Sequence, residues 1–416
     1  MSFEPRPPDL VLRAARVVDD GGLVDIVIAD GRVSALVPAG SAAPAAEEID
    51  CAGRVVIPGL IEPHLHLDKA LLDRERPNPD GTLAGAIEVT GELKRAFTHE
   101  SVRARARRVL DQAVAHGTTH VRAHPDIDPV VGLLAFEVML DLREEYRDAL
   151  DLQIVAFPQE GIFQAPGTEE LLREALRRGA DAVGGCAYNE PDLDTCRRHV
   201  DLVFDLAAEF GVPADLHADM AADGGDPRFA LAEYIAGLTE AAGMGGRVAL
   251  GHVNSLAGRP EHAAVIERLA AAGVAVVPLP FTDTHLNGCV APIRELWAAG
   301  VTAAYSSNNV RNAFTPFGNA DPLDVGLFVA QTFRMSGADL AKVLDMATGQ
   351  AARVIGVADR HGLRPGADAD LVVLGTHRVA DVLLDRPDRC YVLKRGRVVA
   401  RTARTTDLLI RREALL

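Results

Sequence analysis

The middle of the chain alternates short apolar runs with longer stretches rich in alanine and leucine, and this alternation restricts the possible folds most strongly. In chain order the runs occupy residues 59–67, 119–125, 151–159, 181–187, 212–219, 247–255, 273–281 and 301–309. The stretches between them, for example 101–117 and 168–180, have the composition of helices. Parallel strands that are each followed by a helix, in eight units, predict an α/β fold of the (β/α)8 or TIM barrel type. The alternative, an open doubly wound sheet, needs a GxGxxG turn after its first strand, and the sequence has none there.

The two ends of the chain have a different texture and resemble one another. Residues 10–56 contain short strand-like segments, separated by turn signals at 20–22 and 30–31. Segments 368–375 and 391–403 repeat this pattern. We therefore expect a small β-sandwich built from residues 1–58 and 370–416, beside a barrel domain of residues 59–369.

Reactive side chains stand at the ends of the apolar runs. They are His64 and His66, His124, Gln159, His217, His252, and Ser307 with Asn308. Barrel enzymes build their active sites at the carboxyl ends of the strands, so these side chains should converge on one mouth. An isolated HxH is more often a pair of half-buried histidines with ordinary hydrogen bonds, but six polar strand ends on one rim favour a functional site.

The HxH lies in the segment "EPHLHLD" of residues 62–68. Successive side chains of a strand point to opposite faces, so His64 and His66 should share one face. Neutral imidazole is a good ligand for zinc, iron, copper or nickel. With His217 and His252 from the fifth and sixth runs, the pair supplies the protein ligands of a catalytic metal site that keeps an open position. A carboxylate from the eighth run would complete the set as ligand or base.

Composition limits the partners. The chain has 43 basic and 59 acidic residues and a net charge of −16, which argues against nucleic acid or an anionic membrane as a partner. Its five cysteines are scattered, without a CxxC pair, which is typical of reduced thiols in a cytoplasm. The first residues do not have the pattern of a secretory leader, and no stretch is long and apolar enough to span a membrane. We expect a cytoplasmic homo-oligomer that acts on a small molecule.

Six segments, in order and spread over nearly the whole chain, resemble the amidohydrolase superfamily. They are "PGLIEPHLHLDK", "HVRAHPDID", "VAFPQEGI", "DLHADM", "AAGMGGRVALGHVNSL" and "NNVRNAFTPFGNADPLD". The resemblance is to the branch that contains cytosine deaminase and N-isopropylammelide isopropylaminohydrolase. It implies the same barrel with the same β-sandwich, and one divalent metal, zinc or iron.

The resemblance also implies roles for individual residues. His64, His66 and His217 become metal ligands, and His252 becomes a catalytic group beside the metal. Gln159 matches a position that hydrogen-bonds a ring amide of the substrate, although it could instead cap a loop. Lys69 could contact substrate or pair with a surface carboxylate. Asn308 is predicted as a catalytic residue and fourth ligand, Asp219 as a catalytic residue, and Met220 and His285 as substrate-binding residues.

Two positions depart from the pattern of the family. Asn308 stands where the family has an aspartate that binds the metal and moves a proton, and Met220 stands where it has a proton-donating glutamate. An asparagine cannot accept a proton near neutral pH, and a methionine cannot donate one. We therefore expect weak metal binding and poor activity on free cytosine. Asn312 also replaces an expected aspartate, so natural divergence explains Asn308 more economically than an engineered change.

Several functions remain open after these departures. The best single hypothesis is a metal-dependent hydrolase that acts on a C–N bond of a small, cyclic, nitrogen-containing substrate. Its base would then be another carboxylate: Asp219, Asp283, Asp126 or Glu160. The alternatives are a non-hydrolytic enzyme of specialised metabolism, such as a cyclase, dehydratase or isomerase, and an inactive ligand-binding homologue.

Overall fold

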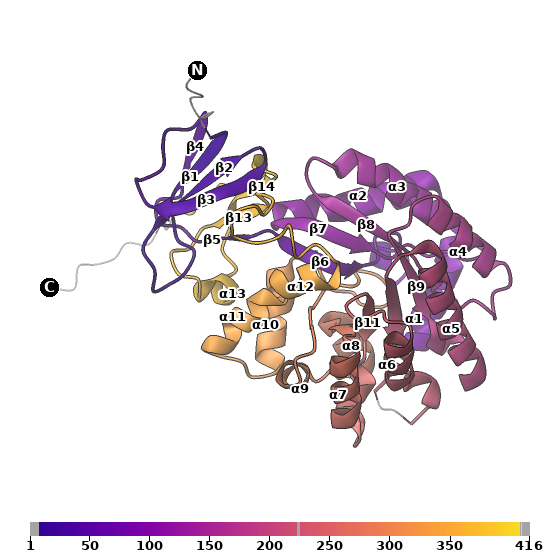
Figure 1. Ribbon diagram of the computed structural model, residues 1–416. Helices are drawn as coiled ribbons and strands as arrows, with labels where there is room; N and C mark the ends of the chain where they lie inside the picture. The colour runs from indigo at the N-terminus through magenta and orange to yellow at the C-terminus, as the bar shows by residue number, and fades with distance from the viewer. Residues whose placement is uncertain (1–7, 223–224, 408, 410–416) are drawn as a thin grey trace.

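The computed structural model describes residues 8–222, 225–407 and 409 of the chain. A barrel surrounded by helices forms the larger part, and a pair of small sheets lies at one end of it (Figure 1). Within the described residues, no helix combines the length and the apolar character needed to cross a membrane.

The barrel strands pair in parallel and in chain order. They are β6 (Leu60–Leu65), β7 (Thr118–Ala123), β8 (Asp151–Ala156), β9 (Ala182–Cys186), β10 (Ala214–Ala218), β11 (Val248–His252) and β12 (Ala275–Val277). Most of their residues are buried, which is usual for parallel strands with helices outside and side chains packed inside.

The eighth run closes the barrel without forming a regular strand. Bridges join Val276 to Ala303 on one side and Leu65 to Asn308 on the other. The amide of His66 donates to the carbonyl of Asn308 over 2.8 Å. The predicted (β/α)8 fold class is therefore confirmed, and the difference is local. The backbone turns into the left-handed region at Asn308, with φ 59°, so the extended ladder cannot continue.

The helices follow the strands around the barrel. The longer ones are α1 (Leu83–Leu93), α2 (His99–Ala115), α3 (Leu134–Tyr146), α4 (Thr168–Arg177), α5 (Leu193–Phe210), α6 (Ala232–Ala241), α7 (His262–Ala272), α8 (Pro280–Asn287), α10 (Pro322–Thr332) and α11 (Ala338–Asp345). Shorter ones are α9 (Ile293–Ala298), α12 (Gly349–Val354), α13 (Asp381–Asp385), η1 (Leu72–Arg74), η2 (Lys94–Ala96), η3 (Ala187–Asn189), η4 (Pro227–Phe229) and η5 (Asn254–Gly258). Local chemistry sets their ends: Thr98 and Ser101 form a capping box that begins α2, and Gly211 ends α5 with φ 70°.

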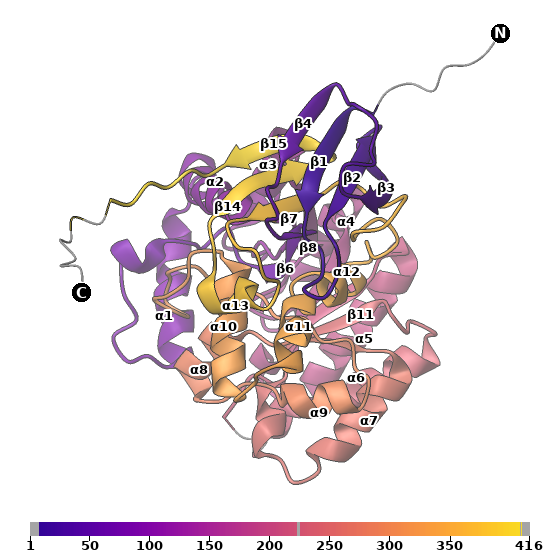
Figure 2. The ribbon, with the colours of Figure 1, turned by 90° about the vertical axis from the view of Figure 1, so that its left-hand side faces the viewer.

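Both ends of the chain build the β-sandwich, as the sequence predicts. One sheet has the order β3 (Arg32–Pro38), β2 (Val24–Ala29), β1 (Leu10–Ala15), β4 (Glu47–Asp50). The other has the order β15 (Arg397–Arg401), β14 (Arg389–Lys394), β13 (Leu371–Leu374), β5 (Val56–Pro58). Figure 2 shows the indigo and yellow strands together at the same end of the molecule. The domain boundaries near 58 and 370 stay a prediction, and residues 1–7, 408 and 410–416 of the predicted sandwich lie outside the described residues.

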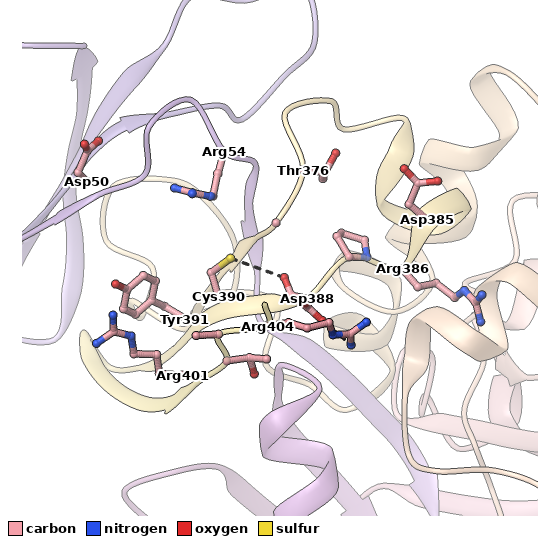
Figure 3. A pocket seen from close by; sticks show the side chains of 14 residues that line it. Asp50, Arg54, Thr376, Asp385, Arg386, Asp388, Cys390, Tyr391, Arg401 and Arg404 are labelled. Carbon is pink, nitrogen blue, oxygen red and sulfur yellow. Dashed lines mark hydrogen bonds and ion pairs between the residues drawn. The ribbon is translucent and has the colours of Figure 1, made fainter. Parts of the chain in front are cut away.

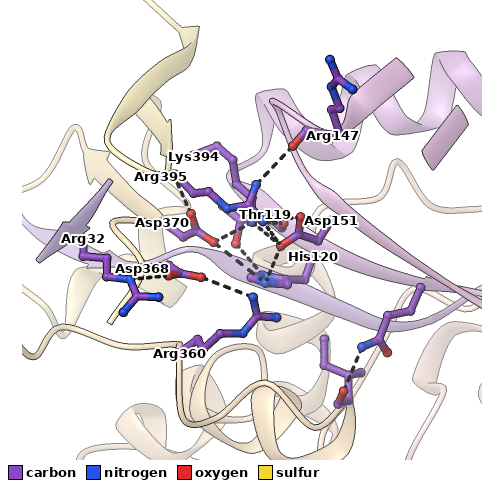
Figure 4. A network of polar contacts seen from close by, with 12 residues as sticks. Arg32, Thr119, His120, Arg147, Asp151, Arg360, Asp368, Asp370, Lys394 and Arg395 are labelled. Carbon is purple, nitrogen blue, oxygen red and sulfur yellow. Dashed lines mark hydrogen bonds and ion pairs between the residues drawn. The ribbon is translucent and has the colours of Figure 1, made fainter. Parts of the chain in front are cut away.

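A buried ionic network joins the sandwich to the amino ends of the barrel strands (Figure 4). The ammonium of Lys394 lies 2.6 Å from Asp370 Oδ2 and 3.0 Å from Asp151 Oδ2. It also donates to the carbonyl of Thr119 over 3.1 Å. His120 Nε2 is 3.3 Å from the same oxygen of Asp151. We call His120, Asp151, Asp370 and Lys394 the base network, because it lies opposite the mouth where the strands end.

Candidate active site

Four of the predicted histidines meet at the carboxyl ends of the strands. His64 belongs to β6, His66 follows that strand directly, and His217 and His252 lie near or at the ends of β10 and β11. All four are buried, and the rings of His64 and His66 are 5.3 Å apart between centroids. The parallel register of the barrel explains this meeting, because it brings every strand end to the same rim.

His64, His66 and His217 offer ring nitrogens that all lie within 4.8 Å of one another. The Nε2 atoms of His64 and His217 are only 2.8 Å apart. Nδ1 of His66 lies 2.9 Å from the carbonyl oxygen of His124. A carbonyl only accepts, so this Nδ1 carries the proton and leaves Nε2 as a lone pair.

Asp215 lies behind His64, and its Oδ1 is 3.1 Å from Nε2 of His124. Its Oδ1 is 3.7 Å from Nδ1 of His64, and its Oδ2 accepts from Arg122 over 2.9 Å. Burial opposes its charge, but His124, His64 and Arg122 outweigh burial and hold the pKa of this carboxyl well below its usual range.

Burial also keeps the three imidazoles neutral. It lowers the pKa of His64, together with the nearby His124, to about 3. It lowers the pKa of His66 and of His217 well below the usual value. Neutral imidazole is the form that binds metals, so these residues fit a divalent metal ion.

His252 is held by a carboxylate on its far side. Its Nδ1 lies 2.6 Å from Oδ1 of Asp283, whose Oδ2 accepts from the amide of Leu279 over 3.0 Å. The proton therefore sits on Nδ1, because a carboxylate only accepts. Nε2 of His252 is buried and has no hydrogen-bond partner among the described residues. Its ring stands 4.7 Å from that of His217.

Asn308 is the remaining group of this centre. Its backbone binds the HxH segment, as described above, while its side-chain Oδ1 is buried without a partner in the described part of the chain. Asparagine tolerates the left-handed conformation better than most residues. An unpartnered buried oxygen is costly, so both Oδ1 of Asn308 and Nε2 of His252 indicate a ligand at this point.

These groups surround a narrow cavity whose water-accessible volume is ≈ 10 Å³. It is lined by His66, Gln159, His217, Met220, His252, Thr282, Asn308, Asn309 and Phe314. Met220 is buried, and the hydroxyl of Tyr188 donates to its sulfur over 3.3 Å. The same hydroxyl oxygen is 3.4 Å from Nδ1 of His217. Met220 thus makes one wall of the cavity apolar. Its sulfur also accepts the hydrogen bond of Tyr188, whose hydroxyl lies beside His217.

Lys69 lies beside Gln159. It is 1% exposed, and its ammonium donates to Oε1 of Gln159 over 2.9 Å. It is not among the residues that line the cavity. The ring of Phe314 lies 5.6 Å from the same ammonium.

Asp219 and His285 lie outside the lining of the cavity. The two carboxylate oxygens of Asp219 accept from the amides of Leu231 and Ala232, over 2.6 and 3.2 Å, at the start of α6. Burial raises the pKa of Asp219 to about 6. His285 is half-buried on α8, 5.9 Å from the ring of Phe317. Of the three other carboxyl groups that the sequence offers as bases, Asp126 and Glu160 pair with Lys94 at 3.1 and 2.7 Å, and Asp283 contacts His252 as described above.

Sequence reasoning missed Asp215, Tyr188 and Asn309. Asp215 had a detectable signal, because it stands two residues before His217 on the same strand and so shares its face. Tyr188 lies in η3, and no pattern in the sequence indicates that this turn reaches His217.

A larger, open hollow lies on the β-sandwich (Figure 3). Arginines and aspartates line it, among them Arg54, Arg401 and Arg404. Arg404 pairs with Asp388 over 2.7 Å. The hollow contains no histidine, and its chemistry does not resemble that of the mouth.

Comparisons with known proteins agree with the geometry. The model of the "Amidohydrolase family" matches residues 47–400. The chain is 31% identical over 406 residues to N-isopropylammelide isopropyl amidohydrolase of Pseudomonas sp. (strain ADP), covering 94% of this chain and 97% of that protein. It is 31% identical over 392 residues to pterin deaminase of Rhizobium rhizogenes, covering 91% and 88% of the two chains. Among solved structures, 5-methylcytosine deaminase of Klebsiella pneumoniae with 5-fluorocytosine matches with a TM-score of 0.89 and 28% identity, covering 96% of this chain and 99% of the other.

Proposed function

The chain belongs to the amidohydrolase family, whose members here are hydrolases of carbon–nitrogen bonds, and from that membership we propose that it hydrolyses a C–N bond of a small nitrogen heterocycle. The reaction takes place in the cavity at the mouth of the barrel. One observation carries the proposal: ring nitrogens of three buried histidines lie within 4.8 Å of one another there, next to two buried polar atoms without partners among the described residues.

The metal of the site would be held by His64, His66 and His217. Oδ1 of Asn308 is the available neutral oxygen beside them. A divalent metal supplies Lewis acidity, which polarises the substrate and lowers the pKa of water. Because Asn308 replaces an anionic ligand, we propose that the metal is zinc or iron and is bound more weakly than with a carboxylate at this position.

His252 and Asp283 form the proton-transferring pair of the proposal. Asp283 keeps the proton of the ring on Nδ1, so Nε2 presents its lone pair to the cavity. This geometry suits a general base that takes a proton from water and gives it to the leaving nitrogen. Asn308 cannot take this part, and Asp219 is committed to the amides of α6, so we assign Asp219 a positioning role.

Met220, on one wall of the cavity, limits which substrates the site can protonate. A thioether cannot protonate a ring nitrogen, and the neighbouring hydroxyl of Tyr188 is already donated to its sulfur. We therefore propose that free cytosine is a poor substrate, and that the true substrate places an apolar edge against Met220.

The proposed substrate is a small molecule, because the relatives named above act on small molecules. We further propose a homo-oligomer, no nucleic-acid partner and, because the five cysteines are all free, a reducing cytoplasmic compartment.

The test is a screen of cyclic amides, ureas and amidines with zinc or iron added, and again with a chelator. The proposal expects release of an amine, of ammonia or of a ring-opened acid that depends on metal and disappears in the His217→Ala variant. Turnover that is unchanged in that variant would contradict it.

A second function is favoured by the absence of a carboxylate from the cavity lining, where Asn308 and Met220 stand among the described residues. A non-hydrolytic enzyme, such as a cyclase, dehydratase or isomerase, or a ligand-binding protein would need no such group. Mass balance separates these functions, since an isomerase or cyclase product does not contain the atoms of an added water.

A further inference from the structure

We propose that Glu62 is a positioning residue of the metal centre, because its carboxylate fastens the eighth run of the barrel to β6 beside the histidines. Glu62 stands two residues before His64 on β6, and its side chain is fully buried. The inference rests on the proposed function in one respect: it takes His64, His66 and His217 as the ligands of the metal.

Both oxygens of this carboxylate bind the eighth run. The amide of Ser307 donates to Oε2 of Glu62 over 2.8 Å, and the hydroxyl of Ser307 donates to Oε1 over 2.5 Å. The hydroxyl of Ser306 also contacts Oε2 of Glu62. A carboxylate has two acceptor oxygens with about four lone-pair sites, so it can hold this group of contacts at one point, which a single carbonyl oxygen could not.

The contacts continue from Glu62 to the metal-ligand candidates. Oγ of Ser306 accepts from the amide of His64 over 3.2 Å and lies 2.6 Å from the carbonyl oxygen of the same histidine. Further along, the amide of His66 donates to the carbonyl of Asn308 over 2.8 Å. Glu62 therefore belongs to a continuous set of contacts that holds the HxH segment and Asn308 side by side.

The eighth run needs this attachment because it does not form a regular strand. Isolated bridges, one of them between Leu65 and Asn308, stand where the other barrel strands have a ladder of backbone hydrogen bonds. The position of Oδ1 of Asn308 relative to the rings of His64 and His66 thus depends on the side chain of Glu62. Metal sites tolerate deviations of only about 0.2 Å in ligand distance, so a small shift of the eighth run would weaken metal binding.

The test is the zinc affinity of the purified full-length protein, measured by competition with a chromophoric chelator. In Glu62→Ala the attachment is lost, and we expect the zinc affinity to fall by about 10–100-fold, as it does when a group that orients metal ligands is removed. In Glu62→Gln the side-chain oxygen can accept from the amide of Ser307, and the amino group can donate to the hydroxyl of Ser307. The zinc affinity of Glu62→Gln should therefore stay close to that of the wild type.

Glu190 provides a matched control, because it is another fully buried glutamate that holds a loop through backbone amides. Its carboxylate accepts from the amides of Ile162, Phe163 and Gln164 over 2.6, 3.1 and 3.1 Å. Glu190→Ala should lower the free energy of unfolding and leave the zinc affinity of the folded protein unchanged, whereas Glu62→Ala should lower both. Urea unfolding of the two variants measures the free energies.

Two results would overturn the inference. One is an unchanged zinc affinity in Glu62→Ala that is folded by circular dichroism. The other is an equal loss in Glu62→Gln and Glu62→Ala, because the charge of Glu62, and not its hydrogen bonds, would then set the affinity. If Glu62→Ala does not fold, Ser307→Ala decides: it removes one contact of Glu62 and should weaken zinc binding by about threefold, and an unchanged affinity would contradict the inference.

Zinc affinity is measured without turnover, which separates the inference from the proposed function. The expected pattern of affinities in a protein that hydrolyses nothing would sink the proposed function alone. Turnover that depends on metal, together with an unchanged zinc affinity in Glu62→Ala, would sink the inference alone. A wild type that binds no zinc would contradict both.

Discussion

The two ends of the barrel contain similar groups of possible metal-ligating side chains, but these groups are paired with a cation of the protein at one end and not at the other. At the base network, the ligand atoms of His120, Asp151 and Asp370 lie within 4.8 Å of one another, as do those of the three histidines at the mouth. The base cluster is already occupied by the ammonium of Lys394, 2.6 Å from Asp370. At the mouth, within the described residues, no cation of the chain fills the centre, and His252 and Asn308 keep unpartnered atoms.

A third cluster of possible ligand atoms is also occupied by a lysine, as the base network is. Asp126, Asp128 and Glu160 also group within 4.8 Å, and the ammonium of Lys94 lies 3.1 Å from Asp126 and 2.7 Å from Glu160. The residue types of a metal site are therefore not enough to identify one. What distinguishes the mouth is that its ring nitrogens lie close together without a cationic side chain from residues 8–222, 225–407 or 409 between them.

The largest effect should come from removing one histidine at each end. His217→Ala should reduce turnover by more than about 10⁴-fold, the upper limit for a single acid–base group, because the metal is lost as well. His120→Ala should leave turnover per folded molecule close to that of the wild type. Steady-state rates of both variants on one substrate check this, and equal losses would remove the distinction between the two ends.

The proton pair of the mouth should have the next largest effect. Asp283→Asn removes the acceptor that keeps the proton on Nδ1 of His252, so turnover should fall by about 10²–10⁴-fold while metal content stays the same. Asp370→Asn is the matched change at the base and should leave the rate intact. If Asp283→Asn retained full turnover, His252 would not be the base.

Breaking the base network should affect stability and not rate. Lys394→Met leaves Asp370 buried without its cation, which costs about 3–5 kcal/mol of unfolding free energy. The double variant Lys394→Met with Asp370→Asn should recover part of this loss, because it removes the uncompensated charge. Urea unfolding of the two variants measures both quantities, and a loss of turnover without a loss of stability would contradict the structural role.

Restoring an anion at the mouth should have a moderate effect. Asn308→Asp adds a charged oxygen beside the three histidines and should raise metal affinity by about tenfold or more. Competition with a chromophoric chelator measures this affinity, with Asn309→Asp as a neighbouring change of the same charge. A lower metal affinity in Asn308→Asp would mean that another set of ligands holds the metal.

The smallest expected effect is the change in stability at low pH. Burial opposes ionisation of Asp151, but His120, Lys394 and Arg395 outweigh it and hold the pKa of this carboxyl well below its usual value. Its contribution to stability is therefore present above a pH of about 4, the ordinary pKa of an aspartate, and is lost as the pH falls further. The stability difference between the wild type and Asp151→Asn should be constant near neutrality and should shrink below that pH, as urea midpoints over a pH series would show.

The barrel and the histidine rim were predictable because both follow from short-range periodicity. A strand places His64 and His66 on one face, and parallel strands bring His217 to the same rim, so two simple rules are sufficient. The eighth run has the pattern of a strand, but in the structure it pairs with its neighbours through isolated bridges. Its backbone turns at Asn308, whose carbonyl accepts from the amide of His66, and the sequence pattern does not indicate this long-range contact.

The roles of Lys69 and Asp219 depend on contacts between distant segments. Lys69 and Gln159 lie in the turns that follow two different strands, β6 and β8, and only the folded register places their side chains 2.9 Å apart. Asp219 is one of four carboxylates that the sequence offers as a base, and its carboxylate accepts from amides at the start of α6. A sequence pattern identifies a strand end, but it does not show which polar groups there already have partners.

The most direct test of the comparison is the metal content of purified protein grown with zinc and iron, measured by inductively coupled plasma mass spectrometry. The account predicts a divalent metal in the wild type that is retained in His120→Ala and lost in His217→Ala. Metal that remains in His217→Ala and is lost in His120→Ala would place the metal at the base and contradict the account.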